Sequence, residues 1–250
     1  MGESPIDAGN FQMPRLSPDG RFLAIMDDRT LQIWIYDLLR GGRTALTSDP
    51  AVMPVWSPVG DEILFTRYIL AEPRLYRKAV FRAELSPSTS RDVWAQPEAG
   101  EPVLIAGTPA SELAPMFSPD GRFLAYDSDE SGRYEVYVVP YPPTGERWAV
   151  STGGGEEPVW SRDGRELFYR HGDQMLVVGV STRPSFAASS PRVLFEGRFE
   201  LTTGGHTQNY DVSPDGQKFL MIQRIDSTRL YEIRVVVGFD RELERLVPVP

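Results

Sequence analysis

The sequence predicts an all-β fold, a β-propeller of about five four-stranded antiparallel blades of which the last is incomplete. The first observation is a turn motif, Ser17-Pro18-Asp19-Gly20, that recurs four times, and the second is the pair of apolar runs that flanks every copy. Consecutive copies begin 40, 61, 43 and 52 residues apart, a period typical of propeller blades and too long for most helical repeats. The later copies are Ser57-Pro58-Val59-Gly60, Ser118-Pro119-Asp120-Gly121, Ser161-Arg162-Asp163-Gly164 and Ser213-Pro214-Asp215-Gly216.

The motif has the composition of a tight hairpin turn. Pro presets φ to about −65° at the second position, and Asp hydrogen-bonds to neighbouring backbone groups. Gly adopts the positive φ that reverses the direction of the chain. Val59 replaces the Asp in the second copy and Arg162 replaces the Pro in the fourth. Both copies keep the Gly, which is the costliest member to replace.

Each turn joins a first strand, which ends in a large apolar residue, to a second strand. We expect the aromatic ends of three first strands, Trp56, Phe117 and Trp160, to be buried between neighbouring blades. The expected second strands are 22–26, 63–66, 123–126, 166–169 and 219–222, and the expected third strands are 31–38, 92–96, 134–140, 175–181 and 230–237. Outer strands are expected near 43–47, 102–106, 147–151 and 192–195, with none convincing in the last blade.

The expected blades lie near 11–47, 51–106, 112–151, 156–196 and 206–237, so that the propeller occupies residues 11–240. Residues 1–10 have no strand pattern and are expected to form a flexible lead-in, and residues 241–250 a C-terminal tail with room for a short helix at 241–246. An incomplete last blade leaves an unpaired strand edge. We therefore expect imperfect ring closure and self-association through this blade.

The long second blade leaves two interpretations open. Residues 68–82 mix aromatic and basic side chains in an otherwise acidic chain. They form either an excursion that faces a ligand or a lengthened hairpin that packs its own aromatic residues.

Composition excludes several classes of function. With 26 basic and 35 acidic side chains the net charge is −9, which repels phosphate backbones, so nucleic acid is not an expected partner. No run of about 18 apolar residues occurs and the first ten residues lack the pattern of a signal peptide, so direct membrane insertion is not expected. A chain complete as written is then expected in the cytoplasm. The absence of cysteine excludes disulfides and thiolate chemistry.

The sequence offers little for catalysis or metal binding. His171 and His206 are the two histidines, and neither accompanies a Gly-x-Ser-x-Gly elbow or a second His at metal spacing. The glycines of 152–155 are not followed by the Lys-Ser or Lys-Thr of a phosphate loop, and they are interpreted as a link between blades. We expect no catalytic residue, no metal and no cofactor in this chain.

The candidate binding site lies at the channel mouth, where the first strands of all blades begin. The residues four to seven positions before each motif Ser converge there, and they are largely polar, which suits a peptide or a small polar ligand. A water-filled channel without a ligand is the alternative. The candidate site residues are Gln12, Glu112, Glu157, His206, Gln208 and Asn209.

The hairpins Ser-Pro-Asp-Gly-Arg-Phe-Leu-Ala at 17–24 and 118–125, with Trp or Phe before the motif Ser at 56, 117 and 160, resemble the TolB-type, WD40-like propeller repeat. The same repeat builds the propeller halves of prolyl-oligopeptidase-type peptidases and C-terminal regions of some bacterial serine/threonine kinases. The stretch from Asn209 to Met221, with the residues after it, is most similar to the closing segment of the kinase-linked propellers.

This resemblance implies a non-catalytic binding or sensor propeller that takes a protein or peptide partner. It also implies the C-terminal part, or a short relative, of a larger protein such as a bacterial serine/threonine kinase. The chain itself holds no kinase Gly-rich loop, His-Arg-Asp or Asp-Phe-Gly motif. The alternatives are the gating half of a prolyl-oligopeptidase-type serine peptidase and a TolB-like envelope interaction module. A membrane-anchored kinase or a TolB-like protein would place the propeller outside the cytoplasm.

Overall fold

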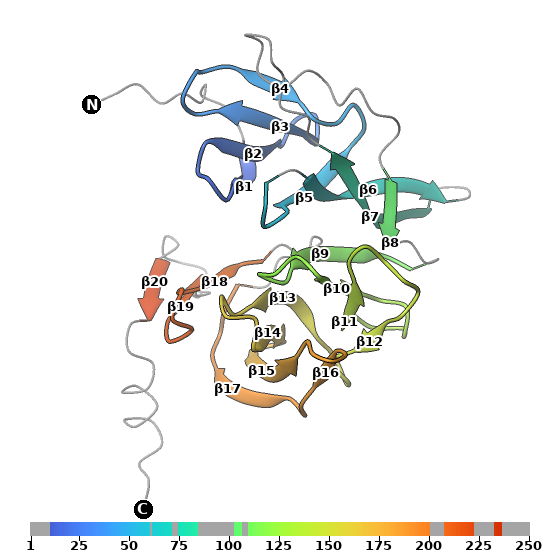
Figure 1. Cartoon of the computed structure of the whole chain (residues 1–250), viewed down its shortest axis with the longest axis vertical. Coiled ribbons are helices and arrows are strands. Elements are labelled where there is room, and N and C mark those ends of the chain that lie inside the picture. The colour runs from blue at the N-terminus through green and yellow to red at the C-terminus, as the bar shows by residue number, and fades with distance from the viewer. Residues whose placement is uncertain are drawn as a thin grey trace, which may run out of the picture.

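The computed structural model describes residues 11–60, 62–71, 75–84, 103–106, 110–200, 208–222 and 233–236. Every helix or strand within these ranges is a β-strand, and the strands form five antiparallel sheets (Figure 1). Within each sheet neighbouring strands follow one another in chain order, except that β17 pairs with β15 in the fourth sheet. The all-β, propeller-type prediction is confirmed.

The strands of the first two sheets run in the orders β1-β2-β3-β4 and β5-β6-β7-β8. Their bounds are β1 (Phe11–Leu16), β2 (Phe22–Asp27), β3 (Gln32–Asp37), β4 (Arg43–Ala45), β5 (Ala51–Trp56), β6 (Glu62–Ala71), β7 (Leu75–Glu84) and β8 (Val103–Ala106). The third sheet contains β9 (Glu112–Phe117), β10 (Phe123–Ser128), β11 (Glu135–Pro140) and β12 (Trp148–Ala149).

The fourth and fifth sheets depart from the regular four strands. In the fourth sheet, β13 (Glu156–Trp160), β14 (Glu166–His171) and β15 (Gln174–Ser181) are followed by β16 (Ala187–Ala188) and β17 (Arg192–Glu196), both paired with β15. The fifth sheet contains β18 (Tyr210–Val212), β19 (Phe219–Ile222) and β20 (Ile233–Val236), with no fourth strand among the described residues. Self-association through this sheet stays a prediction, and residues 1–10 and 241–250 lie outside the described ranges.

The third strand of the second sheet was predicted in the wrong place. It was expected at 92–96, which lies outside the described residues, whereas β7 lies between β6 and β8. The β6–β7 pairing continues from Glu62↔Glu84 to Ala71↔Leu75. A continuous ladder gives the backbone of both segments hydrogen-bond partners. Residues 68–71 and 75–82 therefore pair with each other, as in a lengthened hairpin, rather than forming a separate excursion.

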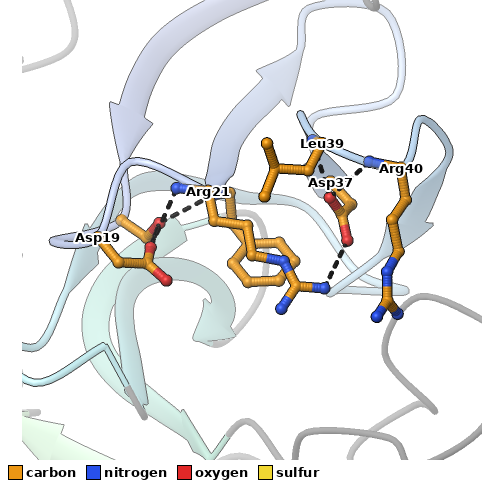
Figure 2. Close-up of polar contacts among 7 residues, drawn as sticks. Asp19, Arg21, Asp37, Leu39 and Arg40 are labelled. Carbon is orange, nitrogen blue, oxygen red and sulfur yellow. Dashed lines mark hydrogen bonds and ion pairs between the residues drawn. The ribbon is translucent and has the colours of Figure 1, made fainter.

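The motif turns are held by the side chains that the sequence places there. In the first copy the Ser17 hydroxyl donates to Asp19, and Asp19 Oδ1 accepts the amide of Arg21 at 3.0 Å (Figure 2). Ser17 Oγ also accepts the amide of Phe22 at 2.9 Å. The third, fourth and fifth copies repeat all three bonds. The Ser17 hydroxyl, followed by the Arg21 amide, lowers the pKa of Asp19 below its ordinary value.

A second carboxylate ties the first turn to the end of β3. Asp37 is buried and accepts the amides of Leu39 and Arg40 at 2.9 and 3.0 Å, and Arg21 Nη2 donates to it at 2.9 Å (Figure 2). Burial alone raises the pKa of Asp37, but the bonds from Arg21 and the two amides outweigh it and lower that pKa. The two ends of the β2–β3 hairpin are thereby fixed to each other.

The second copy lacks its Asp, and we expect Val59→Asp to stabilise the protein. Val59 is 80 % exposed, and Ser57 Oγ accepts the amides of Gly60 and Glu62 at 3.1 and 3.3 Å. Asp at this position supplies the carboxylate acceptor that the other four copies have, and we expect it to raise the free energy of unfolding by about 1 kcal/mol. Urea denaturation measures the change. Val59→Glu is the matched control, since it adds the same charge on a longer side chain; equal stability of the two variants would contradict the prediction.

The core lies between neighbouring sheets, as the sequence predicts. Trp56, Phe117 and Trp160 are 7 %, 6 % and 6 % exposed. Trp56 packs with Phe22 of the preceding sheet, and Phe117 and Trp160 pack in the same way against the sheets before them. The burial of these three aromatic residues is therefore confirmed. Leu16, the equivalent residue of the first sheet, is 59 % exposed, so the fifth sheet does not cover it.

Candidate functional site

The innermost strands bend at one repeated position that the sequence analysis missed. Four residues before the motif Ser, the backbone of the first four sheets adopts a positive φ, and the strand pairing shifts register there. A non-glycine residue in this conformation costs on the order of 1 kcal/mol and persists only where the surroundings fix it. The four residues are Met13 (φ 55°), Met53 (φ 58°), Ala114 (φ 48°) and Glu157 (φ 58°).

A sequence signal for these bulges exists. A proline follows each of the four residues, at Pro14, Pro54, Pro115 and Pro158. Proline has no N–H for a β-ladder and is confined to edges and bulges of sheets. A proline three residues before four of the five motif Ser residues therefore indicates a bulge in an otherwise central strand.

Three of these bulge residues, Met53, Ala114 and Glu157, donate their N–H to a side chain of the preceding sheet. The amide of Met53 donates to Met13 Sδ at 3.3 Å, and the amide of Ala114 donates to Met53 Sδ at 3.2 Å. Ala114 has no acceptor atom in its side chain, and Asp127 Oδ2 takes its place by accepting the amide of Glu157 at 3.0 Å. The Asn209 amide of the fifth sheet then donates to Glu157 Oε2 at 3.2 Å. We call these four bonds the inter-sheet amide bonds.

The structure separates the predicted site residues into two groups. Glu112 and Glu157 are buried, and neither lines a cavity described below. Gln12 is exposed, with its Nε2 donating to Asp28 at 2.9 Å, and Gln208 and Asn209 are half-buried. These last three residues line the channel together. His206 lies outside the described residues.

Glu157 has a structural environment. The Tyr210 hydroxyl donates to the Glu157 carbonyl at 2.8 Å, and Arg170, also buried, approaches the Glu157 carboxylate at 3.5 Å. Arg170 Nη1 in turn donates to the carbonyl of Glu200 at 2.7 Å. Burial, with the Glu157 carboxylate second, raises the pKa of Tyr210 well above its ordinary value. Glu157 therefore positions Asn209 and β18 rather than facing a ligand.

Two cavities lie along the axis enclosed by the innermost strands. One, of about 340 Å³, lies between residues of β1, β5 and the segment before β18, with Gln12, Met13, Met53 and Gln208 among its lining. The other, of about 430 Å³, also reaches β9, β13 and β19. Arg15, Gln208 and Asn209 line both cavities. Their walls combine amide groups with apolar side chains.

Arg15 is the functional candidate that sequence reasoning missed. Its Nη2 donates to Gln208 Oε1 at 2.7 Å, and its Nη1 donates to the carbonyl of Pro14 at 3.2 Å. Burial lowers the pKa of the Arg15 guanidinium, and the carboxylate of Asp211 offsets part of this effect. No single stretch of sequence signals the arrangement, because Arg15 and Gln208 are 193 residues apart.

The glycines of 152–155 bind an anion that belongs to the protein itself. The carboxylate of Glu135, which is buried, accepts the amides of Gly153 and Gly154 at 2.8 and 2.9 Å, and it also accepts bonds from Ser151 and Arg133. The segment links the third and fourth sheets, and no external phosphate is needed to explain its composition.

In the described part of the chain, no group of three His, Asp or Glu side chains is arranged to hold a metal ion, and no helix is long and apolar enough to cross a membrane.

Comparison with known proteins shows which proteins share this fold. No family model matches the chain. The chain is 28 % identical over 157 residues to YuxL, an uncharacterised peptidase of Bacillus subtilis; the match covers 50 % of this chain and 24 % of YuxL. Among solved structures it is similar to TolB from Acinetobacter baumannii, with 18 % identity, a TM-score of 0.64, and coverage of 92 % of this chain and 53 % of TolB.

A puromycin-hydrolysing peptidase from Mycobacterium tuberculosis is a further structural neighbour, with 18 % identity and a TM-score of 0.60. The match covers 92 % of this chain and 37 % of that peptidase. The chain thus spans about a quarter of YuxL and about half of the TolB chain. Its structural neighbours are TolB-type propeller proteins and peptidase propeller domains, whereas the resemblance to kinase-linked propellers stays a prediction.

Proposed function

We propose that this chain is a binding propeller without catalytic chemistry of its own, which takes a segment of a protein or peptide partner at its channel mouth. The observation that carries the proposal is the pair of cavities on the channel axis, where Gln12, Gln208 and Asn209 lie together beside Met13 and Met53. Side-chain amides both donate and accept hydrogen bonds, and this suits the N–H and C=O groups of an extended peptide.

The conformation of the channel wall supports this proposal. Met13 and Met53 hold a strained backbone conformation at the cavity, and strain of this kind clusters at functional sites. Methionine side chains adapt their shape to different partners. The inter-sheet amide bonds hold these residues in place before any partner arrives, which lowers the entropy lost on binding.

The proposed lack of catalysis rests on the titratable groups present. His171 is exposed at the end of β14, and its ring lies against Gly154 rather than beside a Ser and a carboxylate that could complete a triad. The chain would then act through a larger parent protein, for which a kinase sensor region is the expectation from the sequence.

The match to YuxL favours a second candidate, the gating half of a serine peptidase. A gating propeller and a sensor propeller both bind peptide segments, but only the former works beside a hydrolase. Labelling the purified chain with a fluorophosphonate probe tests for a reactive serine of its own. We expect no labelling under either candidate, and labelling would contradict the proposed absence of catalysis.

We expect Gln208→Ala to weaken binding of the partner by about tenfold, because it removes one amide that lines both cavities. The partner is captured on the immobilised chain, identified, purified and titrated by biolayer interferometry. Gln217→Ala is the matched control, since Gln217 is an exposed residue of the same sheet outside the cavities. Unchanged affinity of Gln208→Ala would contradict a channel site and would direct attention to the hairpin at 68–82.

A further inference from the structure

Arg15 is a cation at the two cavities for which the described residues supply no ion pair. It is half-buried and lines both cavities. Its two hydrogen bonds go to neutral oxygens, of Gln208 and Pro14. Among the described residues no carboxylate lies within ion-pairing distance of it, although acidic side chains outnumber basic ones by 35 to 26 in the whole chain.

Two other arginines that are removed from water have a carboxylate partner. Arg170, which is buried, approaches Glu157, and Arg21, which is half-buried, donates to Asp37. Removing a guanidinium from water is unfavourable unless an anion or several hydrogen bonds compensate for it. At Arg15 the compensation is partial, and the space beside it is open.

The carboxylate of Asp211 is the described anion whose charge acts most directly on Arg15, and it is exposed. It raises the pKa of Arg15 by less than burial lowers it. Asp211 and Arg15 form no ion pair. A ligand carboxylate that enters the 430 Å³ cavity reaches a planar fork of N–H donors, which is the geometry that arginine offers for paired hydrogen bonds.

We propose that Arg15 is a carboxylate-recognition residue, and that the segment bound in the channel carries either a free C-terminus or an acidic side chain, which Arg15 binds. This inference rests on the proposed function and names the chemistry of its ligand. The bond from Arg15 Nη2 to Gln208 Oε1 orients the guanidinium before the ligand arrives.

Three short peptides separate the two sources of the carboxylate. They are N-acetyl-tetra-alanine with a free C-terminus, the same peptide as its C-terminal amide, and an amidated peptide with one alanine replaced by glutamate. The indole N–H of Trp56 donates to the Arg15 carbonyl at 2.9 Å, so its NMR resonance reports on this site. The chain has five tryptophans, and the other four indole resonances serve as internal controls for the fold.

We expect the free acid, the glutamate peptide or both to shift the Trp56 indole resonance in a saturable manner, and the neutral amide to shift it far less. Arg15→Gln is expected to weaken this binding by about 10- to 100-fold, because a hydrogen bond to a charged group is lost. Arg15→Lys keeps the charge but loses the fork, and an intermediate affinity is expected. Arg162→Gln removes the same charge from an exposed turn outside both cavities and is expected to bind as the wild type does.

Equal binding of the neutral amide, or undiminished binding by a folded Arg15→Gln variant, would overturn the role of Arg15 while leaving peptide binding in the channel intact. No response of Trp56 to any of the peptides at millimolar concentration would also overturn it. Failure of the proposed function is seen separately, as an unchanged affinity of Gln208→Ala for the purified partner.

Discussion

Replacing Trp160 with alanine is expected to lower the free energy of unfolding by about 4 kcal/mol. The indole ring is 6 % exposed and belongs to the cluster between the third and fourth sheets. Its ring centroid lies 6.5 Å from that of Phe186 in an edge-on arrangement. Truncation removes this burial and leaves a cavity between two sheets that cannot collapse without shifting both. Urea denaturation at neutral pH measures the loss.

Trp160→Phe separates packing from hydrogen bonding. Phenylalanine keeps an aromatic ring at the site but loses the bond from Trp160 Nε1 to the carbonyl of Met116, which is 3.2 Å long. We expect this variant to lose about 1 kcal/mol from the missing bond, with a smaller addition from the reduced ring. If Trp160→Ala were no more destabilising than Trp160→Phe, the packing between these sheets would not depend on the buried ring.

Replacing Glu135 with alanine is expected to cost about 3 kcal/mol, the second largest effect. The carboxylate accepts bonds from Ser151, Gly153, Gly154 and Arg133, and its removal leaves these donors without their acceptor. Thermal and urea unfolding measure the loss, and a cost below about 1 kcal/mol would contradict the role assigned to Glu135.

The same carboxylate makes stability depend on pH in a defined direction. Burial raises the pKa of Glu135, but the bonds from Ser151, Gly153, Gly154 and Arg133 outweigh it and hold that pKa below its ordinary value. A group with a lowered folded-state pKa contributes stability above its unfolded pKa and loses it as the pH falls through the folded value.

The wild type is therefore expected to lose more stability between about pH 5 and pH 3 than Glu135→Gln does. The measurement is the free energy of unfolding at several pH values in this range. Glu146→Gln, at an exposed position between the third and fourth strands of the same sheet, is the control and should keep the wild-type pH profile. Parallel profiles of the wild type and Glu135→Gln would show that Glu135 does not titrate as a stabilising group.

The turns could be predicted from the sequence because their chemistry is local. Ser17, Asp19 and the amides that they bind lie within six consecutive residues, so the tetrapeptide already contains what closes the turn. The third strand of the second sheet could not be placed in the same way. Its position depends on pairing along the β6–β7 ladder, and an apolar pattern alone does not show where such a ladder ends.

The candidate site was predictable only in outline. Gln12, Gln208 and Asn209 reach the channel because the innermost strands begin there, which follows from the repeat. Glu157 was expected in the channel mouth but is buried, because the bulge at its own position turns its carboxylate toward the Asn209 amide. Arg15 was missed because its environment is created by sheets at opposite ends of the sequence.

The inter-sheet amide bonds also give the molecule a direction of assembly. The amides of Met53, Ala114, Glu157 and Asn209 are each accepted by a side chain of the sheet before their own, so these bonds form only after the preceding sheet has formed. This order is the order in which the sheets leave the ribosome. The acceptors also change along the chain, from the weak thioethers of Met13 and Met53 to the stronger carboxylates of Asp127 and Glu157. We therefore expect the inter-sheet amide bonds to become stronger from the first sheet to the last. The later sheets then pack onto a neighbour through strong bonds, whereas the packing between the earlier sheets can still adjust while the propeller assembles.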